Sequence, residues 1–163
     1  MHGQFIHSVH AVVLNWNEFD DTVQCIQSLK NSAAPFSRII LLDQASPDRS
    51  GSRLEQLYQG DQQVLVIRNE KNHGFAEGAN IGIRHALSAG ADMVFLINND
   101  TIVDKNCVER LLEVLTEMPL AAAAGPVIMY FARPDKVWQA GGSFSKLKMG
   151  ISDPGKGRAL SEI

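Results

Sequence analysis

The feature that most constrains the fold is a regular alternation between short apolar runs and helix-forming stretches. The apolar runs lie at residues 9–14, 38–42, 64–67 and 93–97. They are rich in Val, Ile and Leu and, apart from His10 and Arg38, stay apolar instead of alternating, which favours strands buried on both faces. Strands of this kind separated by helices are typical of a parallel sheet. We therefore predict an α/β fold with a mostly parallel central sheet and helices on both faces, in which 93–97 is a central strand.

The stretches between the runs carry helical periodicity. Ser52 and Glu55 have the spacing of a capping box, so Ser52 is expected to begin the second helix. Asp104 is expected to cap the fourth helix and Pro119 to end it. We predict helices over residues 22–30, 52–58, 75–88 and 108–115, followed by less regular strands over 121–130 and 136–139.

Composition and charge limit the class of protein. The 163 residues suit one domain with its own core, and 45% hydrophobic with 20% charged residues is typical of a soluble protein. The net charge of -3 gives no basic field, so no nucleic acid is expected as a partner. No segment reaches the ~18 apolar residues of a membrane span. The first ten residues do not resemble a signal peptide, so we predict a cytoplasmic protein, with peripheral association at the inner face of the membrane left open.

The two cysteines give no sign of a metal or disulfide site. Cys25 and Cys107 each lie in a helical stretch, and neither has a Cys or His at a ligand spacing. We expect both to be buried thiols in a reducing compartment.

Polar residues follow three of the predicted strands. The first strand is followed by Asn15, Trp16, Asn17 and Glu18, the second by Asp43, and the fourth by Asn98, Asn99 and Asp100. The carboxyl ends of parallel strands share one edge of a sheet, and ligands bind there near the point where strand order reverses. One carboxylate in such a place is often only a turn cap. Three polar ends on the same edge favour a ligand site.

The kind of ligand follows from what this edge lacks. There is no G-x-G-x-x-G after the first strand and no P-loop pattern, which argues against a dinucleotide site. Without a glycine cradle, a phosphate needs another counter-charge, and a divalent cation held by Asp100 would supply it. The Asp43 carboxylate suits a ribose diol or a base N–H. Trp16 would offer a flat face to a base or, equally, belong to the core.

The second informative stretch is NEKNHGFAEGANIGI, in which glycines recur every four residues at Gly74, Gly78 and Gly82. A glycine inside a helix costs roughly 1 kcal/mol relative to Ala. Gly74 is expected to allow an unusual backbone angle and Gly78 to let a ligand approach. Gly82 is explained equally well by close packing of the helix on the sheet. Free N–H groups at the helix start, with Asn72 and Asn80, would meet a phosphate or a sugar hydroxyl.

Four motifs occur in order: VVLNWNE (12–18), LLDQASPDRS (41–50), NHGFAEGANIGI (72–83) and FLINNDTIV (95–103). Together they resemble the nucleotide-binding half of a family 2 glycosyltransferase of GT-A fold, in its rhamnosyltransferase-like branch. The resemblance covers about residues 9–130. It implies an N-terminal extension over 1–8, a nucleotide-sugar-binding α/β domain over 9–130, and the start of a truncated acceptor region over 131–163.

The resemblance also implies roles for single residues. Asp100 would bind Mg²⁺ or Mn²⁺ that bridges the donor diphosphate, with Asn98 alongside, and Asp43 would contact the base. Two positions depart from the family pattern: Gln44 replaces the usual Asn, and Asn98 replaces the first Asp of D-x-D. The expected donor-binding set is Asn15, Trp16, Asn17, Glu18, Asp43, Asn72, Gly74, Phe75, Gly78, Asn80, Asn98 and Asn99.

The family's chemistry is inversion at the anomeric carbon by in-line displacement. The metal stabilises the leaving nucleoside diphosphate, and a carboxylate removes the proton of the attacking hydroxyl. In the family that base lies in a later acidic motif, which this chain does not contain, so we expect it beyond Ile163. The resemblance implies a dTDP-rhamnose or UDP-sugar donor and a saccharide or lipid-linked acceptor, as in the synthesis of cell-wall or surface polysaccharide.

Two other functions stay open at this point. A nucleotide-sugar pyrophosphorylase would carry a Gly-rich loop with Arg and Lys after the first strand, whereas this loop is the acidic NWNEFDD. A non-catalytic module would bind a nucleotide sugar or a partner protein through the same sheet edge.

Overall fold

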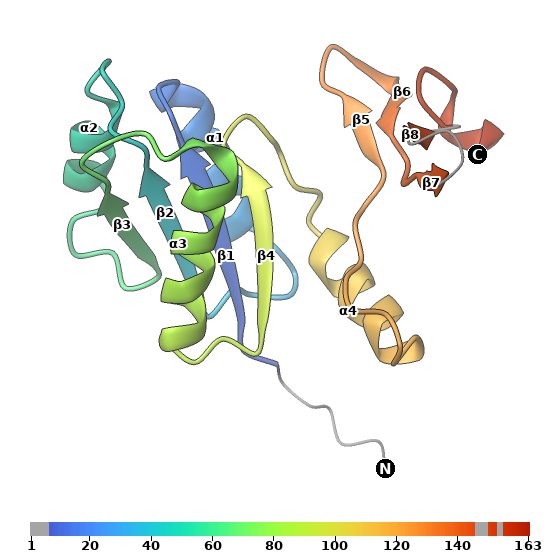
Figure 1. The fold of residues 1–163 in the computed structure, drawn as a ribbon, viewed down its shortest axis with the longest axis horizontal. Coiled ribbons are helices and arrows are strands. Elements are labelled where there is room, and N and C mark those ends of the chain that lie inside the picture. The colour runs from blue at the N-terminus through green and yellow to red at the C-terminus, as the bar shows by residue number, and fades with distance from the viewer. Residues whose placement is uncertain (1–6, 146–149, 153–154) are drawn as a thin grey trace. The chain divides into compact units, whose positions relative to one another are not determined.

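The computed structural model describes residues 7–145, 150–152 and 155–163 and divides the chain into two compact units, Met1–Val108 and Glu109–Ile163. The helix α4 (Cys107–Glu117) spans this division (Figure 1). The first unit contains β1 (Val9–Asn15), α1 (Phe19–Lys30), β2 (Arg38–Asp43), α2 (Ser50–Leu57), β3 (Val64–Arg68), α3 (Gly74–Ser88) and β4 (Met93–Asn98).

The first unit is built on a parallel sheet with the strand order β3-β2-β1-β4. Strand β1 lies between β2 and β4, and the order reverses between β1 and β4. Figure 1 shows α3 in front of the sheet and α1 behind it. The predicted α/β fold with a parallel sheet flanked by helices is therefore confirmed. Folds of this kind bind their ligands at the carboxyl ends of the strands, near the point where the strand order reverses.

Strand β4 corrects one expectation. Among the described residues it is an edge strand, whereas 93–97 was expected to be central. Leu96 is 39% exposed, although Ile97 is buried. Apolar composition alone did not distinguish the two positions, because the pairing partners of a strand decide whether it lies at an edge.

The core of this unit lies on both sides of β1 and β2. Every residue of β1 is buried, and β2 is buried from Ile39 onward. Against the α3 side, Val12, Ile40 and Ala86 form one cluster. A Cβ atom on Gly82 would lie 2.4 Å from Cγ1 of Val12. Close packing of α3 on the sheet therefore accounts for Gly82.

Several helix boundaries differ from those expected. Helix α1 begins at Phe19, ahead of the expected Thr22, because Glu18 takes a left-handed conformation (φ 59°) that turns the chain into the helix. Helix α2 begins at Ser50, and Ser52 lies inside it and donates its hydroxyl to the carbonyl of Arg49. The expected capping box at Ser52 is therefore wrong.

The later elements follow the sequence less closely. The Asp104 carboxylate accepts the N–H of Asn106 (2.9 Å), as expected of a cap ahead of α4. Only Ile128–Tyr130 of the expected strand over 121–130 is extended, as β5. It pairs with β6 (Arg133–Gln139) in an antiparallel hairpin. The short strands β7 (Ser143–Ser145) and β8 (Gly150–Ser152) and the 3₁₀ helix η1 (Leu160–Glu162) complete the second unit.

The cysteines and the apolar helices were each the subject of an expectation. Neither cysteine forms a disulfide; Cys25 is buried as expected, but Cys107 is partly exposed. No helix in the described part of the chain is both long and apolar enough to cross a membrane.

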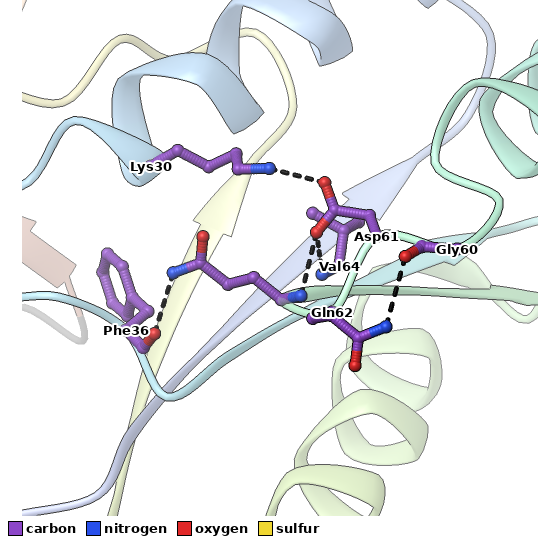
Figure 2. Close-up of polar contacts among 7 residues, drawn as sticks. Lys30, Phe36, Gly60, Asp61, Gln62 and Val64 are labelled. Carbon is purple, nitrogen blue, oxygen red and sulfur yellow. Dashed lines mark hydrogen bonds and ion pairs between the residues drawn. The ribbon is translucent and has the colours of Figure 1, made fainter.

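The amino end of the sheet is closed by contacts around Asp61 (Figure 2). Lys30, at the end of α1, forms an ion pair with this carboxylate, which also accepts the N–H groups of Gln63 and Val64. The hydrogen bond from Lys30 holds the pKa of Asp61 below its usual value. The Gln63 side chain donates to the carbonyl of Phe36 (2.8 Å). These contacts fix the turn before β3 at the end of the sheet opposite the polar strand ends.

We predict that Gly82→Ala destabilises the protein by about 1 kcal/mol. The new Cβ would overpack Val12 at a cost of about 1–3 kcal/mol, and the gain in helix propensity of about 1 kcal/mol offsets only part of it. Urea unfolding measures the difference. Gly125→Ala is the control, because a Cβ there meets nothing within 4 Å. Equal free energies of unfolding for the two variants would contradict the packing argument.

Candidate functional site

A cleft of about 340 Å³ opens at the carboxyl edge of the sheet. Its walls come from the ends of β1 and β4, from the residue after β2, and from the start of α3. It therefore lies at the point where strand order reverses. The lining residues are Leu14, Asn15, Trp16, Glu18, Gln44, Asn72, Gly74, Phe75, Asn98 and Asn99.

The cleft brings most of the predicted donor-binding residues together. Of that set, the residues outside the lining are Asn17, Asp43, Gly78 and Asn80, and the predicted metal ligand Asp100 is also outside it. Sequence reasoning did not place Gln44 or Leu14 in the site. Gln44 directly follows Asp43, at the carboxyl end of a strand beside the switch point, and that position was the signal for it.

The side chain of Asn15 is the centre of a buried polar network. Its Nδ2 lies 2.7 Å from Oδ1 of Asp43, 3.0 Å from Oγ of Ser50 and 3.1 Å from Oγ of Ser46. Its Oδ1 accepts the hydroxyl of Thr22 at 2.7 Å. Both ends of the amide are used inside the protein, and the residue is fully buried. Asn15 therefore joins the loops after β1 and β2.

The Asp43 carboxylate is held from several sides. Oδ1 accepts Asn15 and the Ser46 hydroxyl, and Oδ2 lies 3.3 Å from the N–H of Ser46. A Cβ on Gly51 would approach Oδ2 to 2.1 Å, so only glycine fits where α2 packs against the carboxylate. Asp43 is 2% exposed. Both oxygens of Asp43 therefore already lie close to donors of the protein. The expected contact between Asp43 and a base stays a prediction.

The polar triplet after β4 divides between the interior and the surface. Nδ2 of Asn99 donates to the Thr22 hydroxyl at 2.9 Å and so joins the Asn15 network. Asn98 and Asp100 are exposed. Burial raises the pKa of the Cys25 thiol to about 12, and the charge of Asp100 adds to the rise. The negative charge of the triplet therefore lies at the surface, beside the end of β4.

The loops after β1 and β2 are conformationally strained. Among the described residues, those other than glycine with positive φ are Asn17 (66°), Glu18 (59°), Ala45 (58°) and Arg49 (66°). All of them follow one of these two strands. Left-handed conformations in such residues cost on the order of 1 kcal/mol each and often mark functional sites. The Ser46 hydroxyl accepts the N–H of Asn17 at 2.8 Å and helps to hold this geometry.

The glycines at the start of α3 have distinct roles. Gly74 has φ +73°, the unusual backbone angle expected of it. A Cβ on Gly78 would lie 1.9 Å from Nε2 of Gln44, so the missing side chain of Gly78 makes room for a protein group. Asn80 is exposed on α3.

The residues at the end of β4 offer few ligands for a divalent metal ion. The described residues contain no group of three or more His, Cys, Asp or Glu side chains that could hold a metal ion. Asp100 and Asn98 offer one carboxylate and one amide oxygen, which are the hard donors that Mg²⁺ and Mn²⁺ prefer. These residues fit such an ion only when a ligand such as a diphosphate supplies further oxygens.

Comparison with known proteins gives matches to glycosyltransferases. The model of a family described as glycosyl transferase family 2 matches residues 11–158. The chain is 26% identical over 122 residues to the glycosyltransferase GlyG of Streptococcus pneumoniae. This alignment covers 75% of this chain and 40% of GlyG. It is 32% identical over 108 residues to an uncharacterized glycosyltransferase of Haemophilus influenzae. This alignment covers 66% of this chain and 34% of that protein. The chain thus spans less than half the length of these two relatives.

Solved structures share the fold. A mannosyltransferase from Pyrobaculum calidifontis, in complex with GDP-Man and Mn²⁺, superposes with a TM-score of 0.60 at 18% identity, over 77% of this chain and 35% of that one. Staphylococcus aureus TarS 1-349, in complex with UDP-GlcNAc, gives a TM-score of 0.57 at 16% identity, over 76% of this chain and 38% of that one. At these identities the likeness concerns the fold.

We predict that Asn15→Ala destabilises the protein by about 3 kcal/mol, because it takes one donor from a buried carboxylate and leaves the Thr22 hydroxyl without its acceptor side chain. The double variant Asn15→Ala/Asp43→Ala should lose less than the sum of the two single changes, by about 1–3 kcal/mol. Chemical denaturation of the four proteins in the cycle measures this coupling. Strict additivity would show that the Asn15–Asp43 hydrogen bond does not stabilise the strand ends.

Proposed function

The chain belongs to glycosyltransferase family 2 and has the α/β fold of its structural neighbours, and we propose that its cleft binds the nucleoside diphosphate of a sugar donor. The observation that carries this proposal is the position of the cleft. It lies at the strand-order reversal and is lined by aromatic and polar side chains from β1, β4 and α3. Such an edge is the usual ligand position in open α/β sheets.

Two exposed aromatic side chains support binding of a base or a sugar. Trp16 is 54% exposed and Phe75 is 59% exposed, and both line the cleft from different elements. The exposure of Trp16 removes the alternative of a core tryptophan. We propose that Trp16 stacks on the base and that Glu18 and Asn72 bind hydroxyl groups of the ribose or the sugar.

The proposed metal ligand is Asp100, with Asn98 alongside. Mg²⁺ or Mn²⁺ bound there would supply the positive charge that a leaving diphosphate needs. The exposed carboxylate of Asp100 would hold the ion at the end of β4, and the Asn98 amide lines the adjacent cleft wall. The complex of the Pyrobaculum mannosyltransferase with GDP-Man and Mn²⁺ supports a divalent ion in this fold.

The proposed reaction is inverting transfer of a hexosyl group from the donor to a saccharide or lipid-linked acceptor. We propose dTDP-rhamnose or a UDP-sugar as the donor, in the synthesis of cell-wall or surface polysaccharide in the cytoplasm, at the inner face of the membrane. Glu18 is the carboxylate among the cleft-lining residues, and it follows β1 on the donor side. We assign no catalytic base among the described residues.

The second candidate is a non-catalytic module that binds a nucleotide sugar without transferring it. It is favoured by the composition of the cleft lining among the described residues, in which Glu18 is the one carboxylate, so no second carboxylate is present there to act as a base. Turnover of a radiolabelled donor by this chain and by a form extended past Ile163 separates the two. Turnover in the extended form supports the transferase, whereas binding without turnover in both forms supports the module.

We predict that Mn²⁺ strengthens binding of UDP or dTDP and that Asp100→Asn removes this enhancement. Loss of even an indirect metal partner commonly costs 10–100-fold in metal affinity, so loss of the carboxylate should cost at least ~10-fold. Isothermal calorimetry with and without Mn²⁺ measures it. Asp92→Asn, just before the opposite end of β4, is the control and should keep the enhancement. An intact Mn²⁺ effect in Asp100→Asn would exclude Asp100 as the ligand.

We also predict that Trp16→Ala weakens nucleotide binding by about 1–3 kcal/mol, the usual contribution of base stacking. Trp138→Ala is the matched control, because Trp138 is similarly exposed (44%) but lies on β6. Fluorescence adds a direct measurement, since only two tryptophans are present. Nucleotide should quench the emission of Trp138→Ala and leave that of Trp16→Ala unchanged. The reverse pattern would place the nucleotide elsewhere.

A further inference from the structure

We infer that Gln44 is a positioning residue that fixes the cleft wall formed by residues 72–75. The consequence for ligand affinity rests on the proposed nucleotide function. Gln44 immediately follows β2 and is 3% exposed. It lines the cleft, but its amide is directed to the protein. Its position joins the sheet to the loop that leads into α3.

Both ends of the Gln44 amide are occupied by that loop. Nε2 donates to the carbonyl of Gly74 at 2.8 Å. Oε1 accepts Nδ2 of Asn69 at 2.8 Å and lies 3.5 Å from the N–H of His73. One buried side chain therefore contacts the side chain of Asn69, the N–H of His73 and the carbonyl of Gly74. Because both ends of its amide bind residues 69–74, Gln44 orients this segment.

Gly78 supplies the space that Gln44 needs. A Cβ at position 78 would lie 1.9 Å from Nε2 and 2.8 Å from Cδ of Gln44. Gly78 is buried on the first turns of α3. The two residues are therefore a matched pair: the long side chain of Gln44, just after β2, passes across a position of α3 that has no side chain.

The length of Gln44 matters because the rest of the loop is weakly anchored at its α3 end. At the β3 end, the N–H of Asn69 donates to the Asp43 carbonyl at 2.9 Å. At the α3 end, the N–H of Gly74 donates to Oδ1 of Asn72, inside the loop itself, at 2.7 Å. The bond from Gln44 to the Gly74 carbonyl thus ties the start of α3 to β2. An Asn, shorter by one methylene, would not span this distance without movement of the loop.

The first test is amide hydrogen exchange of the ligand-free protein by NMR. Gln44→Ala and Gln44→Asn should speed exchange at His73 and Gly74 by ~3- to 10-fold, the equivalent of one lost hydrogen bond. Core amides of β1 in the same spectra verify that each variant is folded. Gln63→Ala is the matched control, because Gln63 also donates one bond to a carbonyl, that of Phe36, at the other end of the sheet. Equal exchange at His73 and Gly74 in wild type and both Gln44 variants would overturn the inference.

The second test pairs Gln44 with Gly78. Gly78→Ala should speed exchange at Gly74 in the wild-type background, since the new Cβ displaces the amide. In the Gln44→Ala background it should add less than ~2-fold, because no amide remains to be displaced. Equal effects of Gly78→Ala in both backgrounds would refute the matched pair.

Affinity for UDP and dTDP, measured on the same proteins, links position to binding. Gln44→Ala should weaken binding at least ~5-fold, whereas Gln63→Ala should stay within ~2-fold of wild type. Unchanged affinity in Gln44→Ala would overturn the role of Gln44 in the cleft. A wild type that binds neither nucleotide refutes the proposed function, and the exchange measurements then still decide whether Gln44 fixes the loop.

Discussion

The hydrogen bond between Asn15 and Asp43 is the interaction on which the site depends. Parallel pairing sets Asn15 opposite Asp43 and Leu14 opposite Asn98, so the sheet register brings three strand ends together. At this point the chain buries a carboxylate and an amide, and buried polar groups must find partners. They find them in Ser46 of the loop after β2, in Ser50 at the start of α2 and in Thr22 of α1. The loops are then held in left-handed conformations that they would not adopt alone.

The site consequently has two layers with different tasks. Asn15, Asp43 and Gln44 are buried and bind protein groups, so they fix the shape of the cleft. The exposed layer, which includes Trp16 and Phe75, is left to meet a ligand. Residues that are adjacent in sequence fall into different layers: Asn99 joins the interior network, whereas Asn98 and Asp100 face outward. A change in the buried layer should therefore alter stability and ligand affinity together, and a change in the exposed layer should alter affinity alone.

The sequence predicted the parallel sheet because the apolar runs carry that information locally. It also predicted which strand ends would meet, because parallel strands share an edge. The edge position of β4 was not predictable, since it depends on pairing and not on composition. The start of α2 was misplaced because the left-handed Arg49, a tertiary effect, overrides the capping pattern at Ser52. Gln44 was missed as a site residue. The sequence shows that Gln replaces the usual Asn at this position, but it does not show which groups the longer side chain contacts.

The single carboxylate at the end of β4 sets how a metal would bind under the proposed function. Asn98 stands where a second carboxylate would otherwise add charge, and no cluster of three acidic or metal-ligating side chains exists among the described residues. One carboxylate cannot strip a divalent ion of most of its water, so most of the ligand charge must come from the diphosphate. The ion and the nucleotide then each increase the affinity of the other by the same factor, as linkage requires. In the proposed function Asp100 would orient this assembly at the surface, while the pairing of β1 with β4 and the bond from Asn99 to Thr22 fix the end of β4 that carries it.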